Sequence, residues 1–137
     1  MTFEDIESLL PNGFHDSKIL HFSLDAKTRT LTMRFSLWVG SMDDPNPEAY
    51  REIAVTVQGV SIFFIEPPDP TYPFPLDGQG IAAQGDSVDV ERSRFVSEQA
   101  GNVLKKLSPS ASAYRFFLED WNSFLYIAAE EVSFSWI

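Results

Sequence analysis

The sequence contains no cysteine, and this absence excludes several structures and chemistries at once. A disulfide framework, a thiolate zinc site, an iron–sulfur cluster and a cysteine nucleophile all need a residue that these 137 do not include. The chain also lacks an apolar run close to the roughly 20 residues that a membrane-spanning helix requires. Its opening segment MTFEDIESLL is acidic, whereas a secretory signal peptide begins with basic residues. We therefore expect a cytoplasmic protein that does not bind membranes.

Basic residues are scarce: 10 lysines and arginines stand against 20 aspartates and glutamates, which gives a formal net charge of −10. Proteins that bind nucleic acids neutralise phosphates with lysine and arginine, so nucleic acid is not an expected partner. The acidic residues are spread over the chain and form no separate tail. Such a field would attract a basic protein partner, although a solvated acidic surface without a partner is the simpler alternative.

Hydrophobic residues are plentiful, at 44% of the chain, and 14% of the residues are aromatic. This is enough material for a packed core, and it excludes intrinsic disorder for most of the chain. A length of 137 residues is close to the commonest domain size. Because no interior linker separates two hydrophobic sets, we expect a single domain over residues 1–137.

Two segments have the apolar spacing of helices. The first is Thr2–Leu10, in which Thr2 and Asp5 have the spacing of a capping box. Pro11–Gly13 follows it as a stop signal, because proline cannot extend the helical hydrogen bonds. The second segment is Arg92–Leu107, which contains an unfavourable glycine. The sequence thus predicts a short N-terminal helix and is compatible with a second one.

Alternation of apolar and polar residues predicts strands over much of the remaining chain. The clearest pair is a hairpin of Lys18–Leu24 and Leu31–Val39. In its first strand, Leu20, Phe22 and Leu24 have the same parity, and we expect them on the buried face.

A long strand is predicted from Arg51 to Ile65, but its apolar parity changes at Gly59. A β-bulge or bend at this glycine would explain the change, because one extra residue redirects every later side chain. The two successive inward series are Ile53, Val55, Val57 and Val60, Ile62, Phe64. The other predicted strands are Ser87–Val90, Tyr114–Leu118, Phe124–Ala129 and Val132–Trp136.

Together these segments predict an α+β fold dominated by an antiparallel sheet. We expect about six strands that curl or pack on themselves in a sandwich-like way, with the last three in a meander and the helices at an edge or end. A doubly wound α/β fold is disfavoured, because short turns join most successive strands. The loops Gly40–Ala49 and Pro67–Pro75 are irregular, and five prolines make the second one stiff.

Motifs for catalysis and cofactor binding are few. The chain has no G-x-S-x-G turn and no H-E-x-x-H pattern, and its two histidines, His15 and His21, form no metal-binding pattern. His15 beside Asp16 could act as a general base, but a hydrogen bond that fixes a turn is the alternative. The sequence therefore predicts no catalytic residue, no cofactor and no metal.

Two sets of oxygen-bearing side chains could take part in metal binding or hydrolysis. One is a loop that could offer oxygen ligands to Ca²⁺, although it lacks the EF-hand spacing and an ordinary solvated turn is the alternative. The other could pair two carboxylates for glycoside hydrolysis, which depends on a separation that sequence does not give. The sets are Asp43, Asp44, Asn46, Glu48 and Glu66, Asp89, Asp120.

Aromatic residues suggest a binding surface more directly than the acids do. Trp121 and Asn122 stand between two aromatic strands, where asparagine can adopt a left-handed conformation and tryptophan can cap a core. If Trp38 and Tyr72 join Trp121 at the surface, they form an aromatic patch with an acidic rim, as protein interfaces often have. A purely structural corner is the alternative for Trp121 and Asn122.

The segment Gly13–Ser17 (GFHDS), followed by two alternating strands, resembles small bacterial domains with an N-terminal FHD turn. These domains include predicted immunity proteins of polymorphic toxin systems. The later pattern of Phe116–Phe117, Trp121–Asn122 and Phe124 is similar to a set of uncharacterised bacterial proteins. The resemblance implies a non-enzymatic cytoplasmic protein that binds and neutralises a toxin-like partner, and a basic toxin would be attracted by the acidic charge.

Three functions are consistent with these observations. The first is a protein-binding module of the immunity or inhibitor type, with His15, Asp16, Trp38, Tyr72, Trp121 and Asn122 as candidate binding residues. The second is a small-molecule-binding or hydrolytic domain with a site near His15 and Asp16. The third is a structural subunit that forms homodimers or larger assemblies through the edge of the strand Val132–Trp136.

Overall fold

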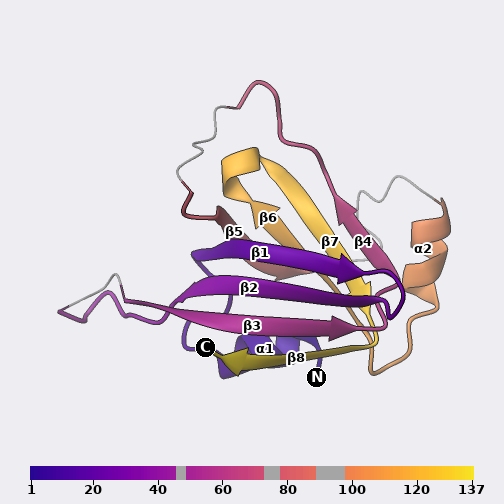
Figure 1. The fold of residues 1–137 in the computed structure, drawn as a ribbon, viewed down its shortest axis with the longest axis horizontal. Coiled ribbons are helices and arrows are strands. Elements are labelled where there is room, and N and C mark those ends of the chain that lie inside the picture. Colours follow the sequence, from indigo (N-terminus) through magenta and orange to yellow (C-terminus); the bar gives the residue numbers. More distant parts are fainter. Residues whose placement is uncertain (46–48, 73–77, 89–97) are drawn as a thin grey trace.

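The computed structural model describes residues 1–45, 49–72, 78–88 and 98–137 (Figure 1). The helical elements are α1 (Phe3–Leu9), α2 (Glu98–Lys105) and the 3₁₀ turn η1 (Glu119–Trp121). The strands are β1 (Ser17–Asp25), β2 (Thr30–Trp38), β3 (Tyr50–Gln58), β4 (Ile62–Ile65), β5 (Ile81–Ser87), β6 (Ser112–Leu118), β7 (Ser123–Ala129) and β8 (Glu131–Trp136).

The described strands form one antiparallel sheet in the order β4-β7-β6-β5-β1-β2-β3-β8. The predicted α+β class, with an antiparallel sheet and two short helices, is confirmed, although the sheet has eight strands rather than about six. The predicted terminal meander is wrong in one respect, because β8 pairs with β3 and not with β7. Only Glu130 separates β7 from β8, and a hairpin commonly needs two loop residues, so the chain bends and continues instead.

A shared bend gives the sheet its curl. The segment from β3 to β4 runs antiparallel to the segment from β7 to β8, and the pairing shifts by one residue where Gly59 lies beside Glu130. Gly59 has a φ of +64°, a conformation that glycine adopts without strain. The bend predicted at Gly59 is therefore confirmed.

The parity predicted beyond Gly59 is only partly correct. Val60 points into the main core, as expected, but in β4 the inward residues are Phe63 and Ile65. Ile62 lies on the other face, beneath α2, and Phe64 is 40% exposed. The sequence could not show this because both faces of β4 bear apolar residues.

Strand β1 also differs from the prediction. Its pairing with β2 is irregular between Ile19 and His21, so the bulge turns Leu20 out to 36% exposure and Ile19 takes the buried position. Phe22 packs against the core, as expected, whereas Leu24 is 45% exposed. On its other side, β1 pairs with β5 through only three residues, Ser17–Ile19.

The main core lies between the two halves of the curled sheet and is rich in phenylalanine. Phe35 of β2 and Phe116 of β6 approach across it, with ring centroids 5.3 Å apart. Phe3 of α1 stacks on Tyr114 at 4.9 Å, and Phe14 reaches the same cluster. These five rings are completely buried, so α1 and the turn after it close one side of the core.

The two helices agree with the sequence to different extents. Thr2 and Asp5 form the predicted capping box of α1, in which each side chain accepts a hydrogen bond from the other residue's backbone N–H. α2 confirms the second half of the predicted Arg92–Leu107 helix, and β5 lies earlier than the predicted strand Ser87–Val90. Residues 89–97 lie outside the described residues. None of the described helices has the length and apolar character needed to cross a membrane.

Two glycines make a matched test of the bend. A Cβ at Gly59 would meet the Glu130 side chain at 2.8 Å and would hold a left-handed φ, so we expect Gly59→Ala to lower the free energy of unfolding by about 1–2 kcal/mol. A Cβ at Gly101, inside α2, meets nothing within 4 Å, so Gly101→Ala should raise the same quantity by about 0.5–1 kcal/mol. Urea denaturation measures both, and equal effects would contradict the assigned bend.

The buried hydroxyl of Tyr114 gives a second test. It has no hydrogen-bond partner among the described residues, and burial, aided by the carboxylates of Glu7, Glu4 and Asp86, raises its pKa. The folded protein therefore keeps this proton while the unfolded chain loses it near pH 10.0. The free energy of unfolding gains nothing from the ionisation of this group below pH 10.0 but should fall by about 1.4 kcal/mol for each pH unit above it.

We expect Tyr114→Phe to remove this alkaline loss and to change the free energy of unfolding at pH 7 by less than about 1 kcal/mol, because the lost hydroxyl has no partner. Denaturation curves from pH 8 to 11 measure both effects. Tyr72→Phe, at a side chain that is 46% exposed, is the control and should leave the pH dependence unchanged. The same alkaline loss in both variants would contradict the burial of the Tyr114 hydroxyl.

Candidate functional site

One end of the sheet collects most of the residues that the sequence singled out. β1 and β7 begin at this end, while β2, β6 and β8 finish there, on the left in Figure 1. All three tryptophans of the chain lie at it: Trp38 is the last residue of β2, Trp121 belongs to η1, and Trp136 is the last residue of β8. We refer to this region as the tryptophan end.

The turn between α1 and β1 places His15 and Asp16 at the tryptophan end. Gly13 and Asp16 have positive φ values of 56° and 53°, which redirect the chain from helix to strand. Asn12 holds the turn to the end of β2, since its amide donates to the carbonyls of Trp38 (3.0 Å) and Gly40 (2.8 Å). The His15 and Trp38 rings are therefore close, with centroids 6.4 Å apart.

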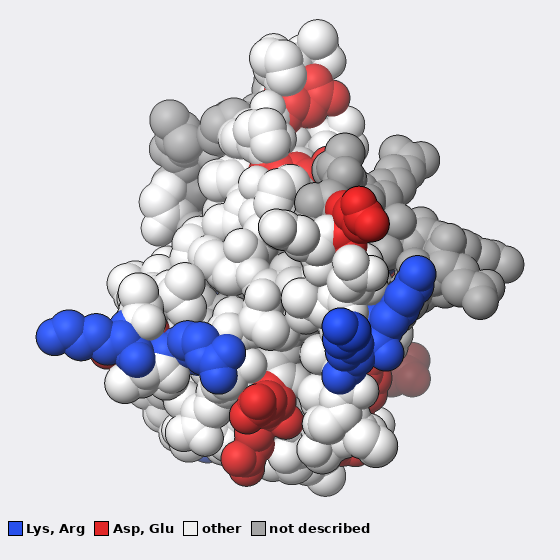
Figure 2. Space-filling view, turned by 90° about the vertical axis from the view of Figure 1, so that its right-hand side faces the viewer, with Lys and Arg blue, Asp and Glu red and all other residues white. Residues whose placement is uncertain are grey.

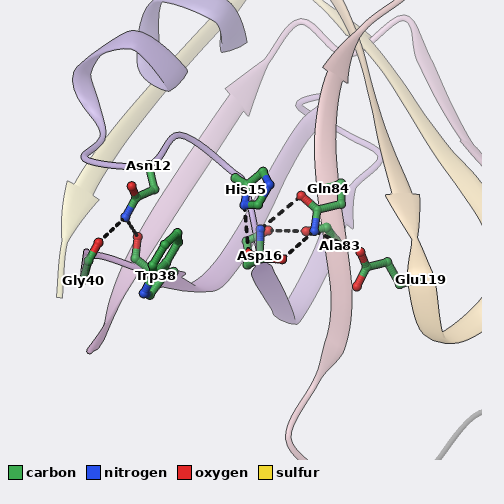
Figure 3. A network of polar contacts seen from close by, with 9 residues as sticks. Asn12, His15, Asp16, Trp38, Gly40, Ala83, Gln84 and Glu119 are labelled. Carbon is green, nitrogen blue, oxygen red and sulfur yellow. Dashed lines mark hydrogen bonds and ion pairs between the residues drawn. The ribbon is translucent and has the colours of Figure 1, made fainter. Parts of the chain in front are cut away.

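A polar network connects His15 to the opposite half of the sheet (Figure 3). His15 Nδ1 lies 2.8 Å from Asp16 Oδ2. The Gln84 amide nitrogen donates to both Asp16 Oδ1 and Glu119 Oε1, each at 2.9 Å. Gln84 Oε1 accepts from the Asp16 backbone at 3.1 Å. One glutamine thus separates and bridges two carboxylates.

The corner after β6 forms the other part of the tryptophan end. Asn122 has a left-handed φ of 48°, as its residue type predicted, and its amide donates to Asp69 Oδ2 at 3.0 Å. The hydroxyl and backbone N–H of Thr71, followed by Asn122, donate to Asp69 and lower its pKa. The Asp69 N–H donates to the carbonyl of Trp121. This corner is thus tied to the proline-rich segment.

The six predicted binding residues fall into two groups. His15, Asp16 and Trp38 form the first, and Tyr72, Trp121 and Asn122 form the second, near Asp69. Gln84 and Glu119 link the groups through the polar network. Tyr72 is 46% exposed, but Trp38 and Trp121 are half-buried, and Trp121 packs against the core. The predicted surface patch is therefore partial, and the structural role considered for Trp121 is present.

His15 and Asp16 form an ion pair that is well exposed to solvent. Their side chains are 66% and 49% exposed, so water competes with any proton transfer and the pair contributes at most about 1 kcal/mol to stability. The hydroxyl of Ser17, the next residue in the chain, is buried (1% exposed) and already donates to the Ala83 carbonyl at 3.0 Å. His21, the second histidine, is exposed on β1.

Three of the residues considered for metal or glycoside chemistry accept hydrogen bonds from backbone N–H groups. Glu66 accepts from the backbone N–H of Phe124, and Asp120 accepts from that of Ala82. Asp44 accepts from the N–H of Ser41 within a turn. Asn46, Glu48 and Asp89 lie outside the described residues. Within the described ranges, no group of three or more histidines and carboxylates could hold a metal ion.

Comparison with known proteins does not extend this picture. The chain matches no family model, no curated protein and no solved structure. The inference of function therefore depends on the geometry of the tryptophan end and on its charges.

Sequence reasoning missed the residues that join the two groups. Gln84 lies in a strand without an unusual pattern, and Glu119 was visible only as part of a turn. Their role depends on the pairing of β5 with β1 and β6, which places residues distant in sequence side by side. Asp69 did stand in a turn-forming stretch with Thr71, which was a usable signal.

Gln84→Glu tests the network. The change replaces the amide donor by a third carboxylate between Asp16 and Glu119, so we expect the free energy of unfolding at pH 7 to fall by about 1 kcal/mol, and by less near pH 4 where carboxylates become protonated. Urea denaturation at both pH values measures this. Gln99→Glu adds the same charge to the first turn of α2, where it is favourable. Equal stability of the two variants at pH 7 would contradict the network.

Proposed function

We propose that the chain is a non-catalytic protein-binding module that uses the tryptophan end to bind a basic polypeptide. The observation that carries the proposal is the bridged pair of carboxylates, Asp16 and Glu119, beside aromatic rings at one end of the sheet. Aromatic side chains supply buried contact area in protein interfaces, while charges at the rim guide the approach of the partner.

The described carboxylates at this end outnumber the nearby basic residues Lys18 and Arg51, and this balance supports a basic partner. Asp16, Asp43 and Asp44 are exposed, and the hydrogen bonds to Asp69 keep its carboxyl ionised to lower pH than usual. Met42 and Tyr50, in and after the neighbouring loop, are 81% and 45% exposed and add apolar contact area. The described carboxylates of this region are Asp16, Asp43, Asp44, Glu66, Asp69, Glu119 and Asp120.

The resemblance to immunity proteins implies a particular biological use for such a surface, namely inhibition of a toxin-like partner. The alternatives receive less support from the geometry. A hydrolytic site at His15 would require a nucleophile and shelter from water, and the pair is well exposed. Homodimer formation through β8 stays a prediction, although the apolar residues Val132, Phe134 and Trp136 contact the chain's own core.

An affinity capture followed by a binding measurement tests the proposal. The tagged chain is incubated with a lysate of its own cells, and the captured protein is purified and titrated by calorimetry at low and high salt. We expect one stoichiometric basic partner with a submicromolar Kd, and we expect this Kd to increase as the salt concentration rises. Asp16→Asn combined with Glu119→Gln should weaken binding by at least about tenfold, because it removes two charges from the surface.

Glu130→Gln combined with Glu131→Gln is the matched control, since it removes the same charge at the opposite end of the sheet. It should leave the Kd within about twofold. Tyr72→Ala tests the aromatic contribution at an exposed position. Failure to recover a partner would contradict the proposal, and so would equal weakening by the two carboxylate pairs.

A further inference from the structure

A groove lies at the end of the molecule opposite the tryptophan end. Two adjoining hollows of about 400 Å³ and about 300 Å³ share Arg29 and Ser61 in their linings. The larger runs along α2, and the smaller runs between the β1–β2 turn and β4. We call the two hollows together the basic groove, for the reason that follows.

The cations at this end of the molecule, two of which line the groove, differ from the other basic residues of the described chain. Elsewhere each basic side chain has a partner: Arg34 pairs with Glu52, Arg115 with Asp86, Lys18 with Gln79, and Arg51 lies over the Trp136 ring. Lys27, Arg29, Lys105 and Lys106 form no hydrogen bond or ion pair through their side chains with any residue that the structure describes. All four are exposed. Asp25, Glu130 and Glu131 lie at the same end of the strands, but none of them forms an ion pair with these cations in the described chain.

The arrangement of these cations favours an extended ligand. Arg29 belongs to the β1–β2 turn and Lys106 follows α2, and both line the larger hollow. Figure 2 shows lysine and arginine side chains on two sides of this face, with uncharged surface between them and acidic side chains just below it. A compact anion such as phosphate needs donors that converge on one point, whereas separated cations fit a chain that carries several carboxylates.

The walls of the groove add apolar contacts. Val103 and Leu107 line the larger hollow, and Leu24, Val60 and Phe63 line the smaller. Leu24 is 45% exposed, so a ligand that covered it would remove apolar surface from water. Glu130 also lines the groove, which makes the site unsuited to the dense phosphate charge of a nucleic acid.

We propose that the basic groove binds an acidic polypeptide segment in which carboxylates alternate with apolar side chains. The carboxylates pair with Arg29 and Lys106, and the apolar side chains contact Leu107 and Leu24. This site is independent of the tryptophan end, because it lies at the other end of the strands and attracts charge of the opposite sign.

Fluorescence anisotropy with a labelled eight-residue peptide of alternating leucine and glutamate tests the proposal on the full chain. We expect saturable binding at low salt. Arg29→Asn with Lys106→Gln should weaken it by at least about tenfold. Asparagine suits position 29 because Arg29 has a positive φ of 52°. Leu107→Ser should also weaken binding, and thermal denaturation checks that each variant is folded.

Lys18→Gln with Arg34→Gln is the control, because it removes the same charge from other surfaces, and it should leave the Kd within about twofold. A peptide with glutamine in place of glutamate should not bind. The proposal is overturned if binding does not saturate, if both variant pairs weaken it equally, or if millimolar inorganic phosphate displaces the peptide fully. The proposal would also be overturned if sedimentation showed that the unchanged chain is a dimer and that Arg29→Asn with Lys106→Gln dissociates it. In that case a second copy of the chain would occupy the groove.

Discussion

The bend that two antiparallel segments share at Gly59 and Glu130 determines the shape of the molecule. Each segment forms two strands of the sheet, and both change direction at the same place, so the pairing survives with a shift of one residue. The Glu130 side chain occupies the space beside Gly59. As a result, the two halves of the sheet face each other, and phenylalanines from both halves pack in one core with α1 against it.

The same curl separates two surfaces that differ in the balance of their charges, although Lys18 and Arg51 also lie at the first and Glu130 at the second. The strand ends at one side carry η1, the turn after α1 and a series of carboxylates. At the other side lie the β1–β2 turn and α2, with cations that lack partners among the described residues and a groove between them. The formal charge of −10 is a property of the whole chain. The charges that a partner meets differ between the two ends, so each end favours a different kind of partner.

The sequence was most informative where local rules decide the structure. The capping box of Thr2 and Asp5, the alternation in β2 and the bend at Gly59 all follow from residue type and spacing, and the structure contains all three. It was least informative where long-range pairing decides. The partner of β8 and the bulge at Leu20 depend on neighbouring strands, and the bridge through Gln84 depends on β5 lying between β1 and β6.

The short pairing of β1 with β5 has a consequence for motion. It involves three residues on each strand, fewer than any other pairing in the described sheet. Two further contacts reinforce the pairing of β1 with β5. They are the hydrogen bond from the Ser17 hydroxyl to the Ala83 carbonyl and the hydrogen bond between Asp16 and Gln84. Local opening should therefore begin here, with the bend as hinge, and amide protons of β5 should exchange before those of β2. A molecule bound to Asp16 and Gln84 would slow that exchange, so binding at the surface would be detected through the amide protons of β5.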